Sequence, residues 1–556
     1  MQKSDFIQAA SLSNPFYYLE NALTVWQWVL KHHCDCLCTE EIQRLQDILN
    51  LPRDAQALLV RMVMRQGELF PLGTLQYAEI ENTNQAVALL EDLKLIEMAP
   101  LISLDEAYSK FNKEVIWTFC HRHFPVPPKK SERKDTLYQR LKSSQWAEKP
   151  RTAQDWGDTD HWIRLRHPSF YKRIQLMFFG NLAQDWSEFI VTELGHIKYE
   201  SISYQPELRA FTNRSDIDRY LHFDDLQADT ENTLLNGADT LEIDPLLLSA
   251  CHNRWLEAKR KRVCFKLAQL FEKNNLLKDA VSLYDATQSN TALVRQLRLM
   301  ERYDSPESII QLAQSALKTI QHSETSIYLL RILHRQQRKL GLPVKRAKPL
   351  EIPELLLHLP ASDYRVENAV AHTLSTSSSP VYYVENRLIP SLWALLFWEA
   401  IYAPIEGAFL HPFQSAPLDI YSKDFFQARA SQLSKLRATI VDGSYQAIIR
   451  RHYHKKYSLQ CPFIHWPSLT EELINLALDN ISSEQLRGMF DYLEQDLRQH
   501  KRGMPDLIQF MTEEKSIRFI EVKAPNDRLQ TSQNLWLEAL IKLKIESYVA
   551  KVTWQS

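Results

Sequence analysis

Two stretches decide the fold of the C-terminal part of this 556-residue chain. They are Gly503-Met504-Pro505-Asp506-Leu507-Ile508 and Phe519-Ile520-Glu521-Val522-Lys523. Gly503 and Pro505 mark a turn, and the run Leu-Ile-Gln-Phe at 507–510 predicts a short, largely buried strand. Residues 511–516 are mostly polar, as a hairpin connection should be. Residues 517–523 are rich in β-branched and aromatic side chains, which favours a second strand. We therefore expect a β-hairpin.

Three charged side chains accompany this hairpin. Because side chains alternate across a strand, Glu521 and Lys523 project from the same face. If the strands pair, Asp506 falls near Glu521 and two like charges converge. Such repulsion is tolerable when a divalent cation lies between the two carboxylates.

An Asp, a strand and then Glu-x-Lys is the arrangement that a metal-dependent phosphodiesterase needs. Carboxylate oxygens hold Mg²⁺ or Mn²⁺, which binds the scissile phosphate and lowers the pKa of a bound water. Lys523 would orient that water or neutralise charge that develops on the phosphate oxygens. Glu-x-Lys alone is a weak signal, because residues 132–134, 257–259 and 513–515 also fit it and are ordinary solvated charges. The full succession is far more specific.

These residues resemble the signature of the VRR-NUC module, a branch of the PD-(D/E)xK nucleases, and in particular that of the Fanconi-associated nuclease family. The resemblance is carried by Gly-Met-Pro-Asp-Leu at 503–507, Ile-Glu-Val-Lys-Ala-Pro-Asn-Asp-Arg-Leu at 520–529 and Gln-Asn-Leu-Trp-Leu at 533–537. Ala524 stands where the family often has Gly, a departure that touches no ligand. We expect a bacterial member of the family.

The resemblance implies roles for individual residues. Asp506 and Glu521 become metal ligands, the carbonyl of Val522 becomes another ligand, and Lys523 becomes the catalytic lysine. Gln533 could face the site and support it. Trp536, one helical turn later, is expected in the core.

A further acidic residue comes from far upstream. Glu385 follows the run Val381-Tyr382-Tyr383-Val384 and precedes a strongly apolar stretch, 388–402, that predicts a helix. It resembles the family's upstream catalytic glutamate, which implies a catalytic role and a place among the metal ligands. Without the family, a carboxylate at a helix start is explained by the helix dipole. The resemblance is strongest over residues 378–430 and 500–552.

The whole composition predicts a soluble, multidomain and mainly helical protein. The chain is 45% hydrophobic and 24% charged with only 11 Gly, and its length exceeds that of one core. The net charge is −2, so a nucleic-acid surface must be local. The longest apolar runs are too short for a bilayer, residues 1–15 lack the apolar core of a signal peptide, and seven Cys favour a reducing compartment. We expect no membrane partner and a cytoplasmic, nucleoid-associated protein if bacterial, or a nuclear one if eukaryotic.

Five regions are expected. They are a helical N-terminal DNA-binding region (1–100), a SAP-like module (101–145), a mixed helical and connecting region (146–249), TPR-like helical repeats (250–349) and the α/β, restriction-endonuclease-like VRR-NUC domain (370–556). The repeats are inferred from similar helical pairs offset by 29 residues, a little short of the TPR period. The SAP-like module is implied by the family.

Two basic runs are candidate DNA-binding residues. Lys129, Lys130, Arg133 and Lys134 begin a helix after a proline turn, where they could meet phosphates. Arg451, Lys455 and Lys456 lie in a run that interleaves cations with aromatic side chains, which suits a phosphate track with base stacking. A solvated helix face explains either run nearly as well.

A cluster of His and Cys at residues 32–38 suggests zinc only superficially. Its Cys-x-Cys-x-Cys spacing differs from that of structural zinc sites, and no partner cluster follows at a suitable distance. A helix end with small hydrophobic residues is the better interpretation.

The resemblance implies a structure-selective DNA repair nuclease that uses Mg²⁺ or Mn²⁺. Its expected activities are 5′-flap endonuclease and 5′-to-3′ exonuclease, in interstrand crosslink repair, with branched or flapped DNA as the partner. A junction-resolvase-like endonuclease with the same module is one alternative. Another is a catalytically idle DNA-binding scaffold with partner-binding repeats, which is disfavoured because Glu385, Asp506, Glu521 and Lys523 are all present.

Overall fold

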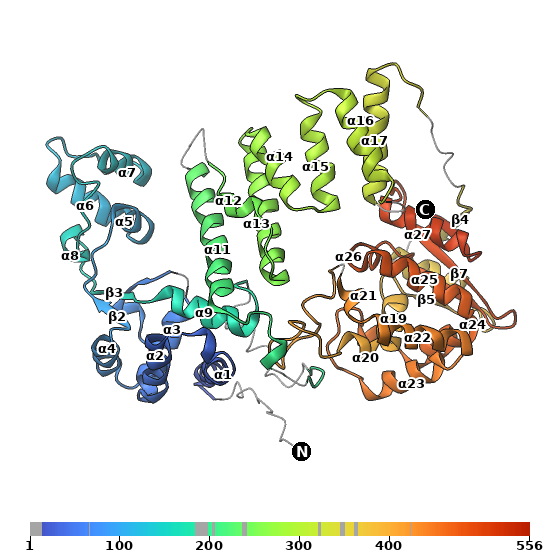
Figure 1. Cartoon of the computed structure of the whole chain (residues 1–556), viewed down its shortest axis with the longest axis horizontal. Helices are drawn as coiled ribbons and strands as arrows, with labels where there is room; N and C mark the ends of the chain where they lie inside the picture. The colour runs from blue at the N-terminus through green and yellow to red at the C-terminus, as the bar shows by residue number, and fades with distance from the viewer. Residues whose placement is uncertain are drawn as a thin grey trace. The chain divides into compact units, whose positions relative to one another are not determined.

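The structure is a computed structural model that describes residues 14–65, 67–183, 198–202, 206–235, 242–320, 324–344, 351–360, 365–422 and 424–555. The chain forms two compact units, residues 1–197 with 212–221, and residues 198–211 with 222–556. The described chain is mainly helical, with one small sheet in each unit (Figure 1). The predicted mainly helical class is therefore confirmed. Part of the predicted connecting region, residues 184–197, lies outside the described residues.

The first unit begins with a helical layer and a three-stranded antiparallel sheet. Its helices are α1 (Tyr17–His32), α2 (Thr39–Asn50), α3 (Arg53–Val63), α4 (Thr83–Asp92) and α9 (Pro168–Phe179). The sheet has the order β1-β3-β2, with β1 (Leu69–Pro71), β2 (Ile96–Met98) and β3 (Trp162–Leu165). The sequence did not predict β1 and β2, because three residues are too few to show an alternation. His32 ends α1 and Cys34–Cys36 form a short 3₁₀ helix, so this stretch lies at a helix end as expected.

A smaller helical group in the first unit carries the first basic run. It comprises α5 (Leu104–Lys110), α6 (Lys113–His123), α7 (Lys134–Lys142) and α8 (Ala153–Trp156). Ser103 and Asn112 cap α5 and α6 by accepting hydrogen bonds from backbone N–H groups in the first turn. Phe119, Leu137 and Trp156 lie in its own small core. The SAP-like character of this group stays a prediction.

A row of consecutive helices makes up much of the first part of the second unit, and its first helix also includes residues 214–221 of the first unit. After α11 (Arg214–Leu235) and α12 (Pro245–Leu248) come α13 (Arg254–Lys273), α14 (Leu277–Ala286), α15 (Asn290–Met300), α16 (Pro306–Leu317) and α17 (Glu324–Lys339). From α12 to α17 each helix packs on the next, and short turns of described residues join α13 to α14, α14 to α15 and α15 to α16 (Figure 1). Left-handed backbone at Asn275 and Gln288 closes the turns after α13 and α14. Of these helices, α13 to α17 lie in the region 250–349 predicted as TPR-like repeats, and their TPR-like character stays a prediction.

A five-stranded mixed sheet forms the centre of the C-terminal domain. Its order is β4-β8-β7-β6-β5, with β4 (Glu354–Pro360), β5 (Val381–Tyr383), β6 (Leu507–Met511), β7 (Ser516–Lys523) and β8 (Glu546–Gln555). β5, β6 and β7 are antiparallel to one another, whereas β7, β8 and β4 are parallel. The predicted hairpin is β6 and β7, and its register places Leu507 opposite Ile520.

Helices cover both faces of this sheet because its strands are apolar on both sides. They are α18 (Val366–Leu374), α19 (Leu388–Leu396), α20 (Trp398–Ile401), α21 (Asp424–Ala428), α22 (Ala430–Asp442), α23 (Tyr445–Lys455), α24 (Glu471–Asn480), α25 (Ser483–Gln495), α26 (Leu497–His500) and α27 (Thr531–Lys542). Ile508 and Phe519 pack into the large core around α19, and Leu507 and Ile520 pack on the opposite face. The predicted helix 388–402 is α19 and α20, every residue of α19 being buried.

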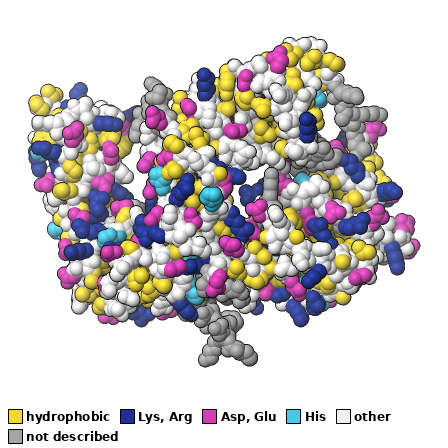
Figure 2. Space-filling view, in the orientation of Figure 1, with side chains coloured by type: hydrophobic (Ala, Val, Ile, Leu, Met, Phe, Trp, Pro, Cys, Tyr) yellow, Lys and Arg dark blue, Asp and Glu magenta, His cyan; other side chains and the backbone are white. Residues whose placement is uncertain are grey.

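Among the described residues, no helix is both long enough and apolar enough to span a bilayer. Lys, Arg, Asp and Glu side chains are interspersed over the face of the protein seen in Figure 2. This mixture agrees with the net charge of −2.

A buried ion pair fixes the loop that follows α20. Arg429 and Asp419 are 0% and 1% exposed, and two guanidinium nitrogens donate to the carboxylate at 2.8 and 3.1 Å. The third nitrogen, Nε, donates to the Ala400 carbonyl at 2.9 Å. A buried guanidinium whose nitrogens are all used in this way depends on its partner carboxylate.

We expect Asp419→Ala to lower the free energy of unfolding by about 3–5 kcal/mol, because the Arg429 charge would remain buried without its partner. Glu546→Ala is the control, since Glu546 pairs with Arg518 on the surface and its loss should cost less than about 1 kcal/mol. Urea unfolding of the two variants and the parent measures the difference. Equal losses in both variants would contradict a dominant role for the buried pair.

Candidate active site

The β6–β7 hairpin brings two acidic side chains together. Asp506 immediately precedes β6, and extending the register of Leu507 with Ile520 by one residue sets Asp506 opposite Glu521. Residues opposite each other in an antiparallel pair lie on the same face. Their exposed fractions are only 7% and 1%. The predicted proximity of the two carboxylates therefore exists in the fold.

Asp506 is held by the backbone of both neighbouring strands. Its Oδ2 accepts a hydrogen bond from the Val522 N–H at 2.8 Å, and its carbonyl accepts one from the Val384 N–H at 2.8 Å. The first bond orients the carboxylate toward β7. The second continues the β5–β6 ladder up to the residue before Glu385.

Glu521 is more deeply buried than Asp506 and has fewer hydrogen-bond partners. Both of its carboxylate oxygens are buried and accept no hydrogen bond from the described residues. The Nζ of Lys523 lies 2.8 Å from Oε1 as an ion pair that lacks the alignment of a hydrogen bond. Burial, and then the charge of Asp506, raise the pKa of Glu521 to about 8, although Lys523 opposes this rise. Burial also raises the pKa of Asp506 to about 6, with Glu385 adding to the rise.

Lys523 is positioned by the helix that follows the hairpin. Its Nζ donates to Oε1 of Gln533 at 3.1 Å, and the same oxygen accepts the Gln530 N–H at 2.9 Å. Gln533 lies in the first turn of α27 and faces Lys523. Trp536 is 1% exposed and donates from Nε1 to the His500 carbonyl, so it lies in the core.

Glu385 comes directly after Val384, whose N–H bonds the Asp506 carbonyl, and its charge adds to the raised pKa of both Asp506 and Glu521. Its two oxygens accept hydrogen bonds from the Tyr383 hydroxyl and from Nδ2 of Asn386. The dipole of α19 was the alternative explanation for a carboxylate here. The side-chain hydrogen bonds of Glu385 come from its own segment, and through Asn386, which accepts the Met504 N–H, that segment is tied to the turn before β6.

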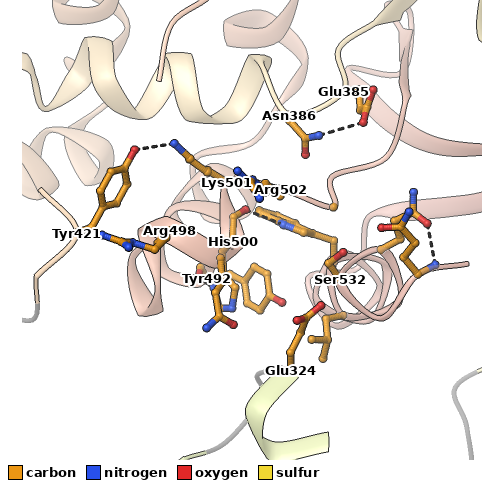
Figure 3. A pocket seen from close by; sticks show the side chains of 16 residues that line it. Glu324, Glu385, Asn386, Tyr421, Tyr492, Arg498, His500, Lys501, Arg502 and Ser532 are labelled. Carbon is orange, nitrogen blue, oxygen red and sulfur yellow. Dashed lines mark hydrogen bonds between the residues drawn. The ribbon is translucent and has the colours of Figure 1, made fainter. Parts of the chain in front are cut away.

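A cavity of about 810 Å³ opens beside Glu385. Figure 3 shows Glu385 and Asn386 at one edge of this cavity and Glu324 at the other, with Lys501 and Arg502 between them. Lys501 donates to the Tyr421 hydroxyl at 2.6 Å, and the guanidinium of Arg498 lies 5.1 Å from the centre of the Tyr421 ring. The cavity therefore joins an acidic edge to a basic wall.

The donor set fits a divalent cation of the Mg²⁺ type. Glu521 offers two buried oxygens that accept no hydrogen bond from the described residues, one of them ion-paired with Lys523, and hard cations prefer carboxylate, carbonyl and water oxygens. In the part of the chain that the structure describes, no three His, Cys, Asp or Glu side chains are arranged to enclose an ion by themselves. A site built from Asp506, Glu521 and a backbone carbonyl would leave room for water ligands, which Mg²⁺ usually keeps.

The first basic run lies on the surface of the first unit. Lys129, Lys130 and Arg133 are exposed, and Lys134 lies 4.9 Å from the centre of the Tyr108 ring. The one carboxylate in the run, Glu132, pairs with Arg140 of α7. Four positive charges therefore remain grouped at the start of α7.

The second basic run has a different character. Lys456 bonds both carboxylate oxygens of Glu200 at 2.7 and 2.8 Å, and Arg451 lies 3.5 Å from Glu399. Lys455 is exposed. The Lys456–Glu200 pair ties the segment 198–202 to α23, so Lys456 has a structural role that the sequence pattern did not indicate. DNA binding by these three residues stays a prediction.

Sequence reasoning missed several residues around the site. They are Tyr383, Asn386, Tyr421, Arg498, Lys501 and Arg502. The last three stand in a basic run directly before Gly503, which was a usable signal. Tyr383 and Asn386 flank Glu385 but carry no pattern of their own.

The comparisons with known proteins agree with this geometry. A VRR-NUC domain model matches residues 440–554, and a model described as "FAN1, HTH domain" matches residues 16–97. The Fanconi-associated nuclease 1 homologue of Pseudomonas aeruginosa is 38% identical over 554 residues, covering 99% of this chain and 98% of the relative. The human Fanconi-associated nuclease 1 is 29% identical over 193 residues, which is 34% of this chain and 19% of the relative.

Solved structures extend the similarity to three dimensions. The crystal structure of paFAN1 bound to a 2-nucleotide 5′ flap DNA with a gap has a TM-score of 0.83 and 37% identity, covering 98% of this chain and 100% of that chain. A second structure of paFAN1, with a 1-nucleotide 5′ flap, gives a TM-score of 0.82.

The VRR-NUC domain and its acidic hairpin define the protein as a DNA-hydrolysing nuclease of a class that depends on divalent metal. The chain belongs to the Fanconi-associated nuclease 1 family, as the sequence predicted.

The raised pKa values of the two carboxyl groups predict how stability depends on pH. With a chelator present, the free energy of unfolding should fall as the pH rises from about 4 to about 8. In the unfolded chain Asp and Glu have pKa values of about 3.9 and 4.3. The folded protein therefore holds protons that the unfolded chain has released, and stability declines until the pH passes about 6 for Asp506 and about 8 for Glu521.

Urea unfolding across this pH range measures the effect. Glu521→Gln should flatten the decline, most clearly between about pH 6 and 8, where Glu521 is the group that titrates. A variant with the parental pH profile would show that Glu521 does not carry the effect.

Proposed function

We propose that this chain is a structure-selective DNA repair nuclease that cuts near 5′ flaps and degrades DNA from 5′ to 3′, in interstrand crosslink repair. Mg²⁺ or Mn²⁺ is its cofactor, held by Asp506, Glu521, the Val522 carbonyl and Glu385. The observation that carries the proposal is the buried Glu521 carboxylate opposite Asp506, whose oxygens accept no hydrogen bond from the described residues and whose one close partner is the ammonium of Lys523. Two buried carboxylates that repel each other are tolerated in a folded domain when they bind a cation that takes part in the reaction.

Each catalytic group has a role that follows from its contacts. When bound, a divalent cation would polarise the scissile phosphate and lower the pKa of a water molecule. The Val522 N–H fixes the carboxylate of Asp506, and Gln533 fixes the ammonium of Lys523 beside Glu521. Lys523 then neutralises charge that develops on the phosphate oxygens.

The basic wall of the cavity would hold the DNA backbone. Arg498, Lys501 and Arg502 line the same cavity as Glu385, so phosphates that contact this wall would place a neighbouring phosphodiester near the carboxylates. Lys501 and Arg498 are both supported by Tyr421. Arg451, Lys455 and Lys456 are more distant candidates for the same strand.

Selectivity for a flap would come from regions outside the nuclease domain, because metal-assisted hydrolysis does not by itself distinguish one phosphodiester from another. The two solved structures of paFAN1 hold 5′-flap DNA, which supports the flap as substrate. A SAP-like module that carries Lys129 to Lys134 would grip the duplex, and TPR-like repeats would space it from the site. Such a protein acts where DNA is, at the nucleoid in the cytoplasm of a bacterium.

Two other functions fit part of the structure. A junction-resolvase-like endonuclease would use the same hairpin, and cleavage of a Holliday junction in preference to a 5′ flap would favour it. An idle DNA-binding scaffold would need no catalytic residues. The contacts that orient Asp506 and Lys523 speak against the scaffold, because an idle domain has no use for them.

We expect cleavage of a labelled 5′ flap to require Mg²⁺ or Mn²⁺, whereas Ca²⁺ should support binding with little cleavage. Asp506→Ala and Glu521→Ala should each slow cleavage about a thousandfold or more, because several kcal/mol of transition-state stabilisation disappears. Asp506→Asn should keep or raise the melting temperature of the metal-free protein and should remove the rise that Mn²⁺ gives.

Glu513→Ala is the matched control for these variants. Glu513 and Lys515 also form Glu-x-Lys but lie exposed in the β6–β7 connection, so the substitution should leave cleavage at the parental rate. Cleavage at the parental rate by Asp506→Ala or by Glu521→Ala would contradict the proposed function.

The basic run of the first unit should determine the preference for 5′-flap DNA over single-stranded DNA. Reversing the charges of Lys129, Lys130, Arg133 and Lys134 to Glu should weaken 5′-flap binding and flatten its salt dependence. The slope of log affinity against log salt falls by about 0.9 for each duplex phosphate that the protein ceases to neutralise. Cleavage of short single-stranded DNA should suffer much less, because it needs only the nuclease domain.

A matched reversal in the helical repeats controls for net charge. Lys278, Lys318, Arg338 and Lys339 are exposed there, and reversing them changes the net charge by the same amount. Binding and cleavage of both substrates are measured across a salt series. If the first reversal harmed flap and single strand equally, or acted no more strongly than the control, the run would be ordinary solvated surface.

A further inference from the structure

Asn386 links the two segments that carry the upstream and hairpin carboxylates. Its Nδ2 donates a hydrogen bond to Oε1 of Glu385 at 3.1 Å. Its Oδ1 accepts a hydrogen bond from the backbone N–H of Met504 at 3.1 Å. One amide group therefore bridges the residue after β5 and the turn that ends in Asp506.

The orientation of this amide is fixed by its two partners. The Met504 N–H can only donate, so it must face the amide oxygen, and the Glu385 carboxylate can only accept while ionised, so it must face the amide NH₂. The reversed amide would satisfy neither. Asn386 also has a φ of +54°, a conformation that Asn adopts more readily than most residues.

Glu385 needs such a clamp because of where it stands. The β5–β6 ladder has only three residue pairs, and Glu385 lies beyond its end. The carboxylates of Asp506 and Glu521 repel it when they are ionised. The Tyr383 hydroxyl and Asn386 Nδ2 each donate to one of its oxygens, and hydrogen bonds to an ionised acceptor are the stronger kind.

We propose that Asn386 and Tyr383 are positioning residues that clamp the Glu385 carboxylate toward Asp506 and Glu521 and so raise the affinity of the site for its divalent cation. The proposal rests on the metal-ligand role of Glu385 in the proposed function. Asn386 has the additional task of keeping Glu385 in register with the Met504–Asp506 turn. Neither residue touches the reacting atoms.

The first test is Asn386→Gly, which removes the amide and keeps a residue that accepts positive φ. The half-saturating Mn²⁺ concentration for 5′-flap cleavage should rise about 10- to 100-fold, the usual effect of removing a group that orients a metal ligand. The rise in melting temperature caused by Mn²⁺, measured without DNA, should shrink at a fixed Mn²⁺ concentration. Metal-free DNA binding should stay near that of the parent, and the Mn²⁺-induced rise is read against each variant's own metal-free melting temperature, because the lost Met504 bond can lower that temperature by itself.

Asn275→Gly is the matched control. Asn275 also has positive φ, at +63°, but it lies in the exposed turn between α13 and α14. The control should leave the Mn²⁺ response unchanged. Tyr383→Phe removes the other hydrogen-bond donor without altering the backbone and should shift the Mn²⁺ response in the same direction, which tests the clamp even if Asn386→Gly folds poorly.

A double-mutant cycle asks whether the effect passes through Glu385. In a Glu385→Gln background, Asn386→Gly should add little further change in the Mn²⁺-induced melting shift, because the carboxylate that it orients is already gone. An equal added loss in both backgrounds would overturn the positioning role. So would a parental Mn²⁺ response in both Asn386→Gly and Tyr383→Phe.

Failure of this inference is distinguishable from failure of the proposed function. If Asp506→Ala abolishes cleavage and the Mn²⁺ shift while the two clamp variants respond like the parent, only the clamp is wrong. If Asp506→Ala keeps both cleavage and the Mn²⁺ shift, the metal site itself is wrong.

Discussion

The burial of two like-charged carboxylates on one face of a hairpin is the constraint on which the rest of the nuclease domain depends. Asp506 and Glu521 are almost fully removed from solvent, and burial is the main reason that the pKa of each is raised. Such a site opposes folding, so the surrounding structure must supply the stability. The sheet does this by packing apolar side chains on both of its faces and by burying all of α19.

The distribution of charge follows from the same constraint. A chain with a net charge of −2 has no global field to attract DNA, and basic and acidic side chains are mixed over the visible surface (Figure 2). Attraction must therefore be local. The cavity places its basic wall next to the acidic edge, and Tyr421 supports that wall by contacting both Arg498 and Lys501. This arrangement would let phosphate approach carboxylates that repel it.

The hairpin and the pairing of Asp506 with Glu521 were predictable, because they follow from alternation over a few neighbouring residues and from one turn. The partners of single side chains were not predictable. Lys456 pairs with Glu200, which lies 256 positions earlier in the chain, and no pattern in the basic run indicated that partner. Asn386 carries no sequence pattern, and its role emerges only when β5 and β6 align. Strands of three residues, such as β1 and β2, also left no periodic signal.

The turn from Gly503 to Asp506 explains why these distant groups converge. Gly503 has a φ of +82°, and a Cβ built on it would lie 2.6 to 2.9 Å from Ser532 atoms in the first turn of α27. That close approach brings α27 against the turn, and the same helix carries Gln533, which holds Lys523. The N–H of Met504 donates to Asn386 in the segment after β5, and the Asp506 carboxylate accepts the Val522 N–H of β7. One short turn therefore contacts α27, β7 and the segment that carries Glu385. A side chain at position 503 would separate α27 from the turn and would disturb Lys523 and Asp506 together, so glycine is required there by space as well as by backbone conformation.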